Sequence, residues 1–204
     1  MKIKILLFMI SAFLFAGCSR PIANLNSTGE NVICFGASIT HGYGVAQGKD
    51  FPALLSESLN EPVINAGNPG DTTRHALDRL DRDVLNMNPK LVLIEFGAND
   101  YFQKMSAIET FRNLEKLIRK IQGAHAAVVL VEVRLGLLSD KFGKRMKELA
   151  EKTKAGYVSH VMKGIIANPQ LKVDSIHPNA KGYEIIAKRI HKVVAPLLRK
   201  MKKY

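Results

Sequence analysis

Residue types that together can form an activated nucleophile occur at two points of the chain. Ser38 follows the apolar run NVICF at residues 31–35, and Asp174 stands three residues before His177 in the stretch DSIHPN. A serine hydroxyl is unreactive at its own pKa, so an imidazole must take its proton and a carboxylate must hold that imidazole in the right tautomer. Because Asp174 and His177 share one short loop, their side chains can meet directly. The pattern therefore predicts a nucleophile at Ser38.

Such a nucleophile also needs donors for the negative charge that develops on the substrate oxygen. Three candidates each follow a different apolar run: the N–H of Ser38, the N–H of Gly67 in NAGNPGDTT, and the side-chain amide of Asn99 in FGAND. Taken singly, these are more often turn or capping residues, and His177 before Pro178 is equally typical of a helix start. Their combination predicts an active site.

The elements that must position these residues alternate along the chain. Strands are predicted at 31–35, 62–66, 90–96, 126–133 and 156–159, and helices at 51–59, 73–87, 106–122, 140–153 and 178–200. Continuous apolar strands between amphipathic helices indicate a parallel sheet covered on both faces, which binds ligands at the carboxyl ends of its strands. The helix at 106–122 is expected to open with a capping box of Ser106 and Glu109 and to bury Ile108.

At these residues the chain resembles the GDSL, or SGNH, hydrolase family. The four letters name Ser, Gly, Asn and His, which occur in family order as Ser38, Gly67, Asn99 and His177. The resemblance covers residues 31 to about 190. It implies a three-layer α/β/α, flavodoxin-like fold whose central, mainly parallel sheet has about five strands.

The resemblance also implies hydrolysis of an ester or thioester through an acyl-enzyme. Ser38 would attack, His177 would act as base and then as acid, and Asp174 would orient His177. The oxyanion would be bound by Ser38 N–H, Gly67 N–H and Asn99 Nδ2. The family usually has Asp after its first glycine, where this chain has Ala37; we expect activity to survive that difference.

Three functions are compatible with these residues. The branch of periplasmic thioesterases and lysophospholipases implies an acyl ester or thioester, or a lysophospholipid; a carbohydrate O-acetylesterase of the cell envelope is the alternative. A lipid-tethered binding protein without turnover is the third, and the intact site residues favour a hydrolase. Leu135, Leu137 and Leu138 are expected to form an acyl-binding wall. No cofactor is implied, and no metal is expected because the other histidines lack metal-ligand spacing.

The first residues have the pattern of an export signal. Residues 1–17 read as a signal peptide, and LFAGCS resembles a lipobox with Cys18 lipidated; an ordinary signal peptide cut nearby is the alternative. Residues 18–30 are predicted to be a polar tether and residues 31–204 the hydrolase domain. The protein is therefore expected in the bacterial periplasm or cell envelope, anchored to a membrane. Beyond Cys18 only Cys34 remains, so we expect no disulfide framework.

The chain is basic. Its formal net charge is +12, and loss of Lys2 and Lys4 with the signal peptide would leave about +10. Much of this charge lies in the last helix and tail, AKRIHKVVAPLLRKMKKY. Such a helix can lie against anionic lipid head groups or an anionic partner, or simply present a solvated face. Nucleic acid is not expected to be the partner of an exported chain.

Overall fold

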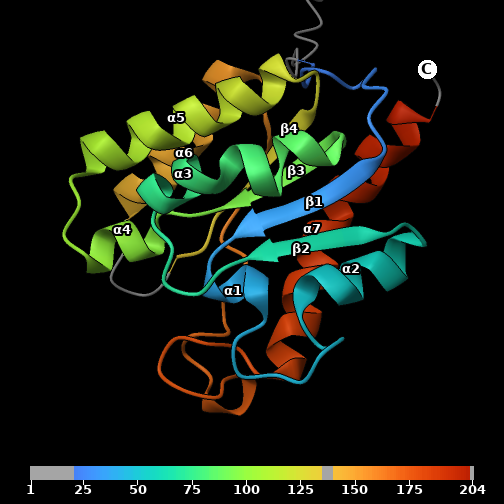
Figure 1. Ribbon diagram of the computed structural model, residues 1–204. Coiled ribbons are helices and arrows are strands. Elements are labelled where there is room, and N and C mark those ends of the chain that lie inside the picture. Colours follow the sequence, from blue (N-terminus) through green and yellow to red (C-terminus); the bar gives the residue numbers. More distant parts are fainter. Residues whose placement is uncertain (1–20, 135–139, 203–204) are drawn as a thin grey trace, which may run out of the picture.

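Five parallel strands form a single sheet in the computed structural model, which describes residues 21–134 and 140–202. The sheet has the order β2-β1-β3-β4-β5 (Figure 1). The strands are β1 Asn31–Gly36, β2 Val63–Gly67, β3 Pro89–Glu95, β4 Ala127–Val131 and β5 Gly156–Val158. The predicted α/β fold with a five-stranded parallel sheet is confirmed.

Helices cover both faces of this sheet. Above it in Figure 1 lie α3 Thr73–Asp83, α5 Ala107–Gly123 and α6 Asp140–Thr153, and below it lie α2 Phe51–Leu59 and α7 Ala180–Met201. Two short helices, α1 Ser38–His41 and α4 Ala98–Phe102, follow β1 and β3, and 3-10 turns occur at Leu85–Met87 and Pro169–Leu171. The architecture is therefore three-layered.

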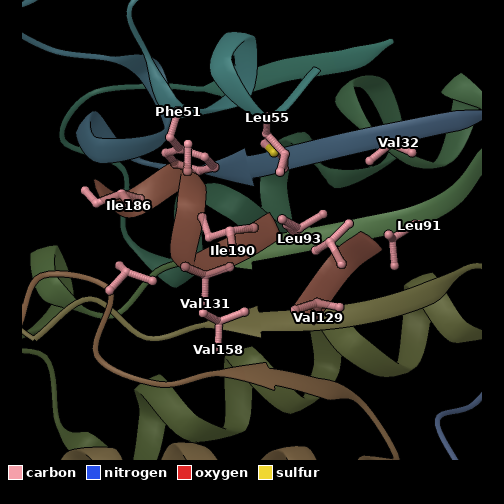
Figure 2. Close-up of a cluster of buried hydrophobic side chains, with 14 of the residues drawn as sticks. Val32, Phe51, Leu55, Leu91, Leu93, Val129, Val131, Val158, Ile186 and Ile190 are labelled. Carbon is pink, nitrogen blue, oxygen red and sulfur yellow. The ribbon is translucent and has the colours of Figure 1, made fainter. Parts of the chain in front are cut away.

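Side chains that alternate along each strand fill two separate cores. In β1, Val32 and Cys34 belong to the buried cluster on the α2 and α7 side, together with Phe51 and Ile190. Figure 2 shows part of this cluster. The neighbouring Ile33 and Phe35 belong to the other cluster, with Leu80 and Leu114 among others. Because the strands are apolar on both faces, as expected for a parallel sheet, the polar ends of the strands stand out.

Two predicted helices differ in detail. The helix expected over 73–87 ends at Asp83, and Met87 is exposed in the 3-10 turn that follows. Asn88 adopts the left-handed conformation and precedes Pro89, whose ring disfavours a helical residue before it. In α5, Ile108 is 74% exposed rather than buried, because this first turn precedes the part of α5 that packs on the sheet.

The capping box expected at the start of α5 is half formed. Ser106 Oγ accepts a hydrogen bond from Glu109 N–H at 3.1 Å, as predicted. The carboxylate of Glu109 instead accepts a bond from Arg74 of α3 at 2.6 Å. An ion pair with a neighbouring helix has replaced the reciprocal bond to the cap, and it joins α3 to α5.

The described part of the expected tether lies on the domain. Ile22 and Leu25 pack against the core, and Ala23 N–H donates to Lys154 O at 2.9 Å. The Asn24 amide donates to Gln122 O and Ala126 O at 2.8 and 3.0 Å. Residues 22–30 therefore cross the edge of the sheet at which the strands begin, instead of forming a free linker. Cys18 and the predicted signal peptide lie outside the described residues.

The cysteine in β1 is a buried structural residue. Cys34 is fully buried and free, and burial raises the pKa of its thiol well above the ordinary value. A thiol held neutral in this way is unreactive, because the thiolate is the nucleophile. Cys34 therefore acts as a small apolar side chain.

Candidate active site

Ser38 stands where β1 turns into α1, just past the carboxyl end of β1. Gly36 permits this turn: a Cβ there would lie 2.0 Å from Thr40 Oγ1 and 2.8 Å from Glu95 Oε2. Only glycine leaves room for such a close return of the backbone. Ser38 is the first residue of α1, and its side chain is partly exposed beside the buried Ile39 and Thr40.

The structure brings Ser38, His177 and Asp174 together. His177 Nε2 lies 3.0 Å from Ser38 Oγ, and His177 Nδ1 lies 2.7 Å from Asp174 Oδ2. This is the geometry required for a base that takes the hydroxyl proton while a carboxylate holds its other nitrogen. Two residues that the sequence places on one loop thus meet a third from the opposite end of the chain.

The loop itself fixes the carboxylate. Asp174 Oδ1 accepts backbone N–H bonds from Ile176 and His177 at 2.9 and 2.7 Å. Burial works against the charged form, but the hydrogen bonds from the His177 side chain and from the two backbone groups outweigh it and lower the pKa of Asp174 to about 2. The Asp174 side chain is therefore an anion at neutral pH, ready to stabilise an imidazolium.

A short backbone bridge holds His177 ahead of α7. Val173 N–H donates to His177 O at 3.0 Å, and Asn179 caps α7 by accepting from Gly182 N–H at 3.1 Å. On the other side, the ring of Tyr43 lies over the imidazole, with centroids 4.3 Å apart and a 39° tilt. The sequence analysis did not identify Tyr43 as a site residue. The only sequence feature that could have indicated it is its position five residues after Ser38.

Two of the expected oxyanion donors, Asn99 and Gly67, already donate hydrogen bonds within the protein. Asn99, in α4, donates one Nδ2 hydrogen to Asp71 O at 2.9 Å, and an amide has a second hydrogen to offer. Gly67 N–H donates to Asn65 Oδ1 at 2.9 Å. A Cβ on Gly67 would lie 2.2 Å from His41 N, so this glycine allows β2 to approach α1 closely. Gly67 has a clear structural role, and its N–H already has a partner.

The same loop offers a second glycine. Asn68 to Asp71 form a turn in which Asp71 N–H donates to Asn68 O at 3.3 Å, with Pro69 and Gly70 at its centre. Gly70 has φ +85° and open space where a side chain would stand. Proline followed by glycine with positive φ is typical of a type II turn, which is the sequence signal that could have singled out Gly70.

A buried carboxylate holds the turn that carries the nucleophile. Glu95, at the end of β3, is 3% exposed, and its Oε2 accepts bonds from Ala37 N–H, Thr40 N–H and Thr40 Oγ1 at 3.2, 3.2 and 2.9 Å. Burial raises the pKa of Glu95 to about 7, although the bonds from Thr40 and Ala37 oppose the shift. In the sequence, this role of Glu95 is indicated only by its position near the end of the apolar stretch KLVLIEF.

Arg79 links the carboxyl ends of β1 and β2 close to the candidate site. Its guanidinium donates to Gly36 O and Ala66 O, both at 3.0 Å, and to Asp71 Oδ2 at 2.6 Å. The group is buried and lies 4.4 Å over the ring of Phe35. Because one planar cation contacts both strand ends and the 68–71 turn, it fixes their relative positions.

Two further expectations concern the acyl-binding wall and the absence of a metal site. Leu135, Leu137 and Leu138, the expected acyl wall, lie outside the described residues. An apolar groove of about 390 Å³ runs between α2 and α7, lined by Leu54 and Ala187 among others, and none of the expected site residues lines it. Over residues 21–134 and 140–202, no group of three or more His, Cys, Asp or Glu side chains is placed to hold a metal ion.

Comparison with known proteins identifies the family. Residues 34–185 match the GDSL-like Lipase/Acylhydrolase family. The chain belongs to this family. The predicted membership is thereby confirmed, and with it the class of enzyme, a serine hydrolase of ester bonds.

Two curated relatives and one solved structure are similar over most of their length. "Thioesterase 1/protease 1/lysophospholipase L1" of Escherichia coli K12 is 27% identical over 83% of this chain and 85% of its own. An arylesterase of Vibrio mimicus is 31% identical over 78% and 84%. The crystal structure of the psychrotrophic esterase EstA from Pseudoalteromonas sp. superposes with a TM-score of 0.75 at 28% identity, covering 83% of this chain and 99% of that one.

Proposed function

We propose that this enzyme transfers the acyl group of a carboxylic ester or thioester to Ser38 and then to water. The contact of His177 with both Ser38 and Asp174 carries this proposal. A protein that had kept the fold for binding alone would have no need of a hydroxyl, an imidazole and a carboxylate in line. Activity as a hydrolase is therefore favoured over a non-catalytic binding role.

In the first half-reaction the oxygen of Ser38 attacks the substrate carbonyl carbon. His177 Nε2 takes the hydroxyl proton, and Asp174 stabilises the imidazolium and keeps the remaining hydrogen on Nδ1. The carbonyl oxygen becomes an oxyanion. Collapse of the tetrahedral intermediate breaks the ester or thioester bond, and His177 gives the proton to the departing alcohol or thiol. The acyl group remains on Ser38.

In the second half-reaction water replaces the alcohol. His177 takes a proton from the water as its oxygen attacks the acyl-enzyme, and a second oxyanion forms at the same position. When this intermediate collapses, His177 returns the proton to Ser38 Oγ and the carboxylic acid leaves. The enzyme is then ready for another substrate molecule.

The oxyanion donors remain part of the proposal. Ser38 N–H, at the first position of α1, and the second Nδ2 hydrogen of Asn99 are two of them. Gly67 N–H is the predicted third donor and would have to leave Asn65 Oδ1 to serve. Gly70 N–H is an alternative donor from the same loop, since Gly70 borders an open space and its neighbour Asp71 contacts Asn99.

The substrate class follows from the family and from the named relatives. Thioesterase, lysophospholipase and arylesterase activities occur among the names of the relatives, and all release an acyl group from an ester or thioester. We infer that this chain acts on acyl esters or thioesters of small molecules, lysophospholipids included.

We also propose that the enzyme is exported and lipid-anchored through Cys18. The signal-peptide pattern of residues 1–17 and the lipobox-like LFAGCS support this. In the described part of the chain, no helix has the length and apolar character needed to cross a membrane. Attachment through acyl chains on Cys18 would supply the membrane link, because several acyl chains bind a bilayer firmly.

The test is hydrolysis of p-nitrophenyl esters from acetate to palmitate by the chain lacking residues 1–18. Ser38→Ala should abolish the activity, whereas Ser58→Ala, a serine of α2 remote from the site, should retain it. Activity extending to medium and long chains would support the acyl hydrolase. Activity confined to acetate would indicate an O-acetylesterase, and activity that survives in Ser38→Ala would refute the assigned nucleophile.

A further inference from the structure

The two ends of the sheet differ in what they carry. At the carboxyl end stand Ser38, Asn99 and His177. At the opposite end, where the strands begin, the chain arrives from its N-terminal segment: Ala23 N–H binds Lys154 O ahead of β5, and Glu30 N–H binds Asn88 O ahead of β3. The N-terminal segment from Ala23 to Glu30 and the proposed active site therefore lie toward opposite ends of the domain.

Helix α7 spans the distance between these ends. It begins three residues after His177 and has 22 residues, so it is about 33 Å long at 1.5 Å per residue. At its far end Lys202 Nζ lies 3.2 Å from Glu61, which precedes β2. The C-terminal turn of α7 is thus at the edge of the sheet where the strands begin.

The N-terminal segment reaches the domain beside this end of α7. A Cβ on Gly156, at the start of β5, would lie 3.4 Å from Ile22 and 3.5 Å from Leu197. Ile22 and Leu197 therefore both pack at one point of the sheet edge. The described chain therefore begins next to the last turns of α7.

This edge is basic. Lys154, Arg199, Lys200 and Lys202 are exposed there. Glu61 is already matched by Lys90 and Lys202, and the exposed acids near this end include Glu30, Glu57 and Glu151. We call the four exposed basic residues the basic edge. Lys and Arg side chains close to an anionic lipid surface are attracted to its head groups.

The distance from the predicted anchor to the domain is short. Three residues separate Cys18 from Ile22, so their Cα atoms are at most about 15 Å apart at 3.8 Å per step. Strand β1, six residues at about 3.3 Å each, adds about 20 Å between the basic edge and the end that carries Ser38. A lipid on Cys18 would hold the basic edge at the bilayer and keep Ser38 away from it.

We propose that the basic edge rests on the anionic membrane surface to which Cys18 is anchored, with Ser38 opening toward the water on the far side of the domain. The proposal rests on the lipidation of Cys18 and on the role of Ser38 given above. Its consequence is a substrate class: acyl esters or thioesters that reach the enzyme from the aqueous phase, rather than lipids embedded in the anchoring bilayer.

The orientation is tested with full-length, lipidated protein in vesicles of phosphatidylethanolamine and phosphatidylglycerol. A fluorophore is attached to Thr28→Cys, in the N-terminal segment at the end of the sheet where the strands begin, or to Gln47→Cys in the loop after α1. A quencher is placed on the lipid head groups. Quenching should be several-fold stronger at position 28, since collisional quenching needs close approach. Equal quenching, or stronger quenching at position 47, would overturn the proposal.

The charge component is tested separately with the chain lacking residues 1–18. It should sediment with phosphatidylglycerol vesicles but not with phosphatidylcholine vesicles, and added salt should release it. Arg199→Glu with Lys200→Glu should lose most of this binding. Arg112→Glu with Lys116→Glu, an equal charge change on exposed positions of α5, should retain it; equal loss in both would refute the assigned face.

Failure of this proposal can be told apart from failure of the proposed function. Every variant is assayed in solution with p-nitrophenyl butyrate, which needs no membrane. Retained hydrolysis with the wrong quenching pattern would reject the orientation alone. The mass of the full-length protein shows whether Cys18 carries acyl chains, and an unmodified Cys18 would remove the anchor on which the orientation depends.

Discussion

His177 Nε2 lies 3.0 Å from Ser38 Oγ although 139 positions separate the two residues in the chain. Each residue is held by its own end of the fold: Ser38 by the turn after β1, and His177 by the bridge that precedes α7. Their meeting therefore depends on the packing of α7 along the sheet. Stability of the fold and reactivity of the serine are coupled through that helix.

Removal of the imidazole or of its orienting carboxylate should reduce turnover strongly. We expect His177→Gln and Asp174→Asn each to lower kcat by about 10³-fold or more with little change in KM, because the proton acceptor is lost or held in the wrong tautomer. Steady-state kinetics with p-nitrophenyl butyrate checks this. His191→Gln, on α7 away from Ser38, is the matched control. A loss of less than about tenfold in His177→Gln would reject its role as base.

Gly67 is predicted to be required for the position of α1. In Gly67→Ala the new Cβ would lie 2.2 Å from His41 N and 2.7 Å from His41 Cα, so the backbone behind Ser38 must shift. We expect at least about a tenfold loss of kcat, because small misplacements of a nucleophile are costly, together with a lower melting temperature. Gly123→Ala is the control, since nothing lies within 4 Å of its Cβ. Normal kcat in Gly67→Ala would show that the turn adapts.

Much of the site could be predicted because its signals are local. Strand ends are marked by an apolar run that stops at glycine, and Asp174 and His177 are close enough in sequence to meet on one loop. Ser38 and Asn99 each follow such a run. In a parallel sheet these ends share one edge, so separate local patterns converge without knowledge of the packing.

The remaining features depend on contacts that no local pattern contains. Glu95 acts on residues 55 and 58 positions earlier in the chain. Ile22 reads as part of a polar linker until its contact with the core is seen. Each is a tertiary interaction, which overrides local propensity.

Tyr43 is predicted to support the base through its ring. The ring covers one face of His177 at 4.3 Å, so Tyr43→Ala would give the imidazole more freedom and more water. We expect about a tenfold loss of kcat/KM, since loss of orientation affects the transition state most. Tyr43→Phe keeps the ring and should restore near-normal values. If Phe fails as badly as Ala, the hydroxyl and not the ring is responsible.

Glu95 is predicted to make stability depend on pH. Its pKa is raised to about 7 in the folded protein from 4.5, so between these values the unfolded chain binds fewer protons than the native protein. The free energy of unfolding should therefore fall as pH rises from about 4.5 to 7, by up to about 3 kcal/mol, and then level off. Urea unfolding at pH 5 and pH 8 measures the difference, and Glu95→Gln, which cannot titrate, should remove that part of it.

The same residue is predicted to position the nucleophile. Glu95→Ala leaves the Ala37 N–H, the Thr40 N–H and the Thr40 hydroxyl without their acceptor. Buried groups left unpaired cost about 1–3 kcal/mol each, so the turn carrying Ser38 should loosen and both stability and kcat should drop. Glu95→Gln retains a carbonyl oxygen at this place and should recover most of kcat. Equal loss in the two variants would mean that the charge is needed, whereas unchanged kcat in Glu95→Ala would show that the turn holds Ser38 without this side chain.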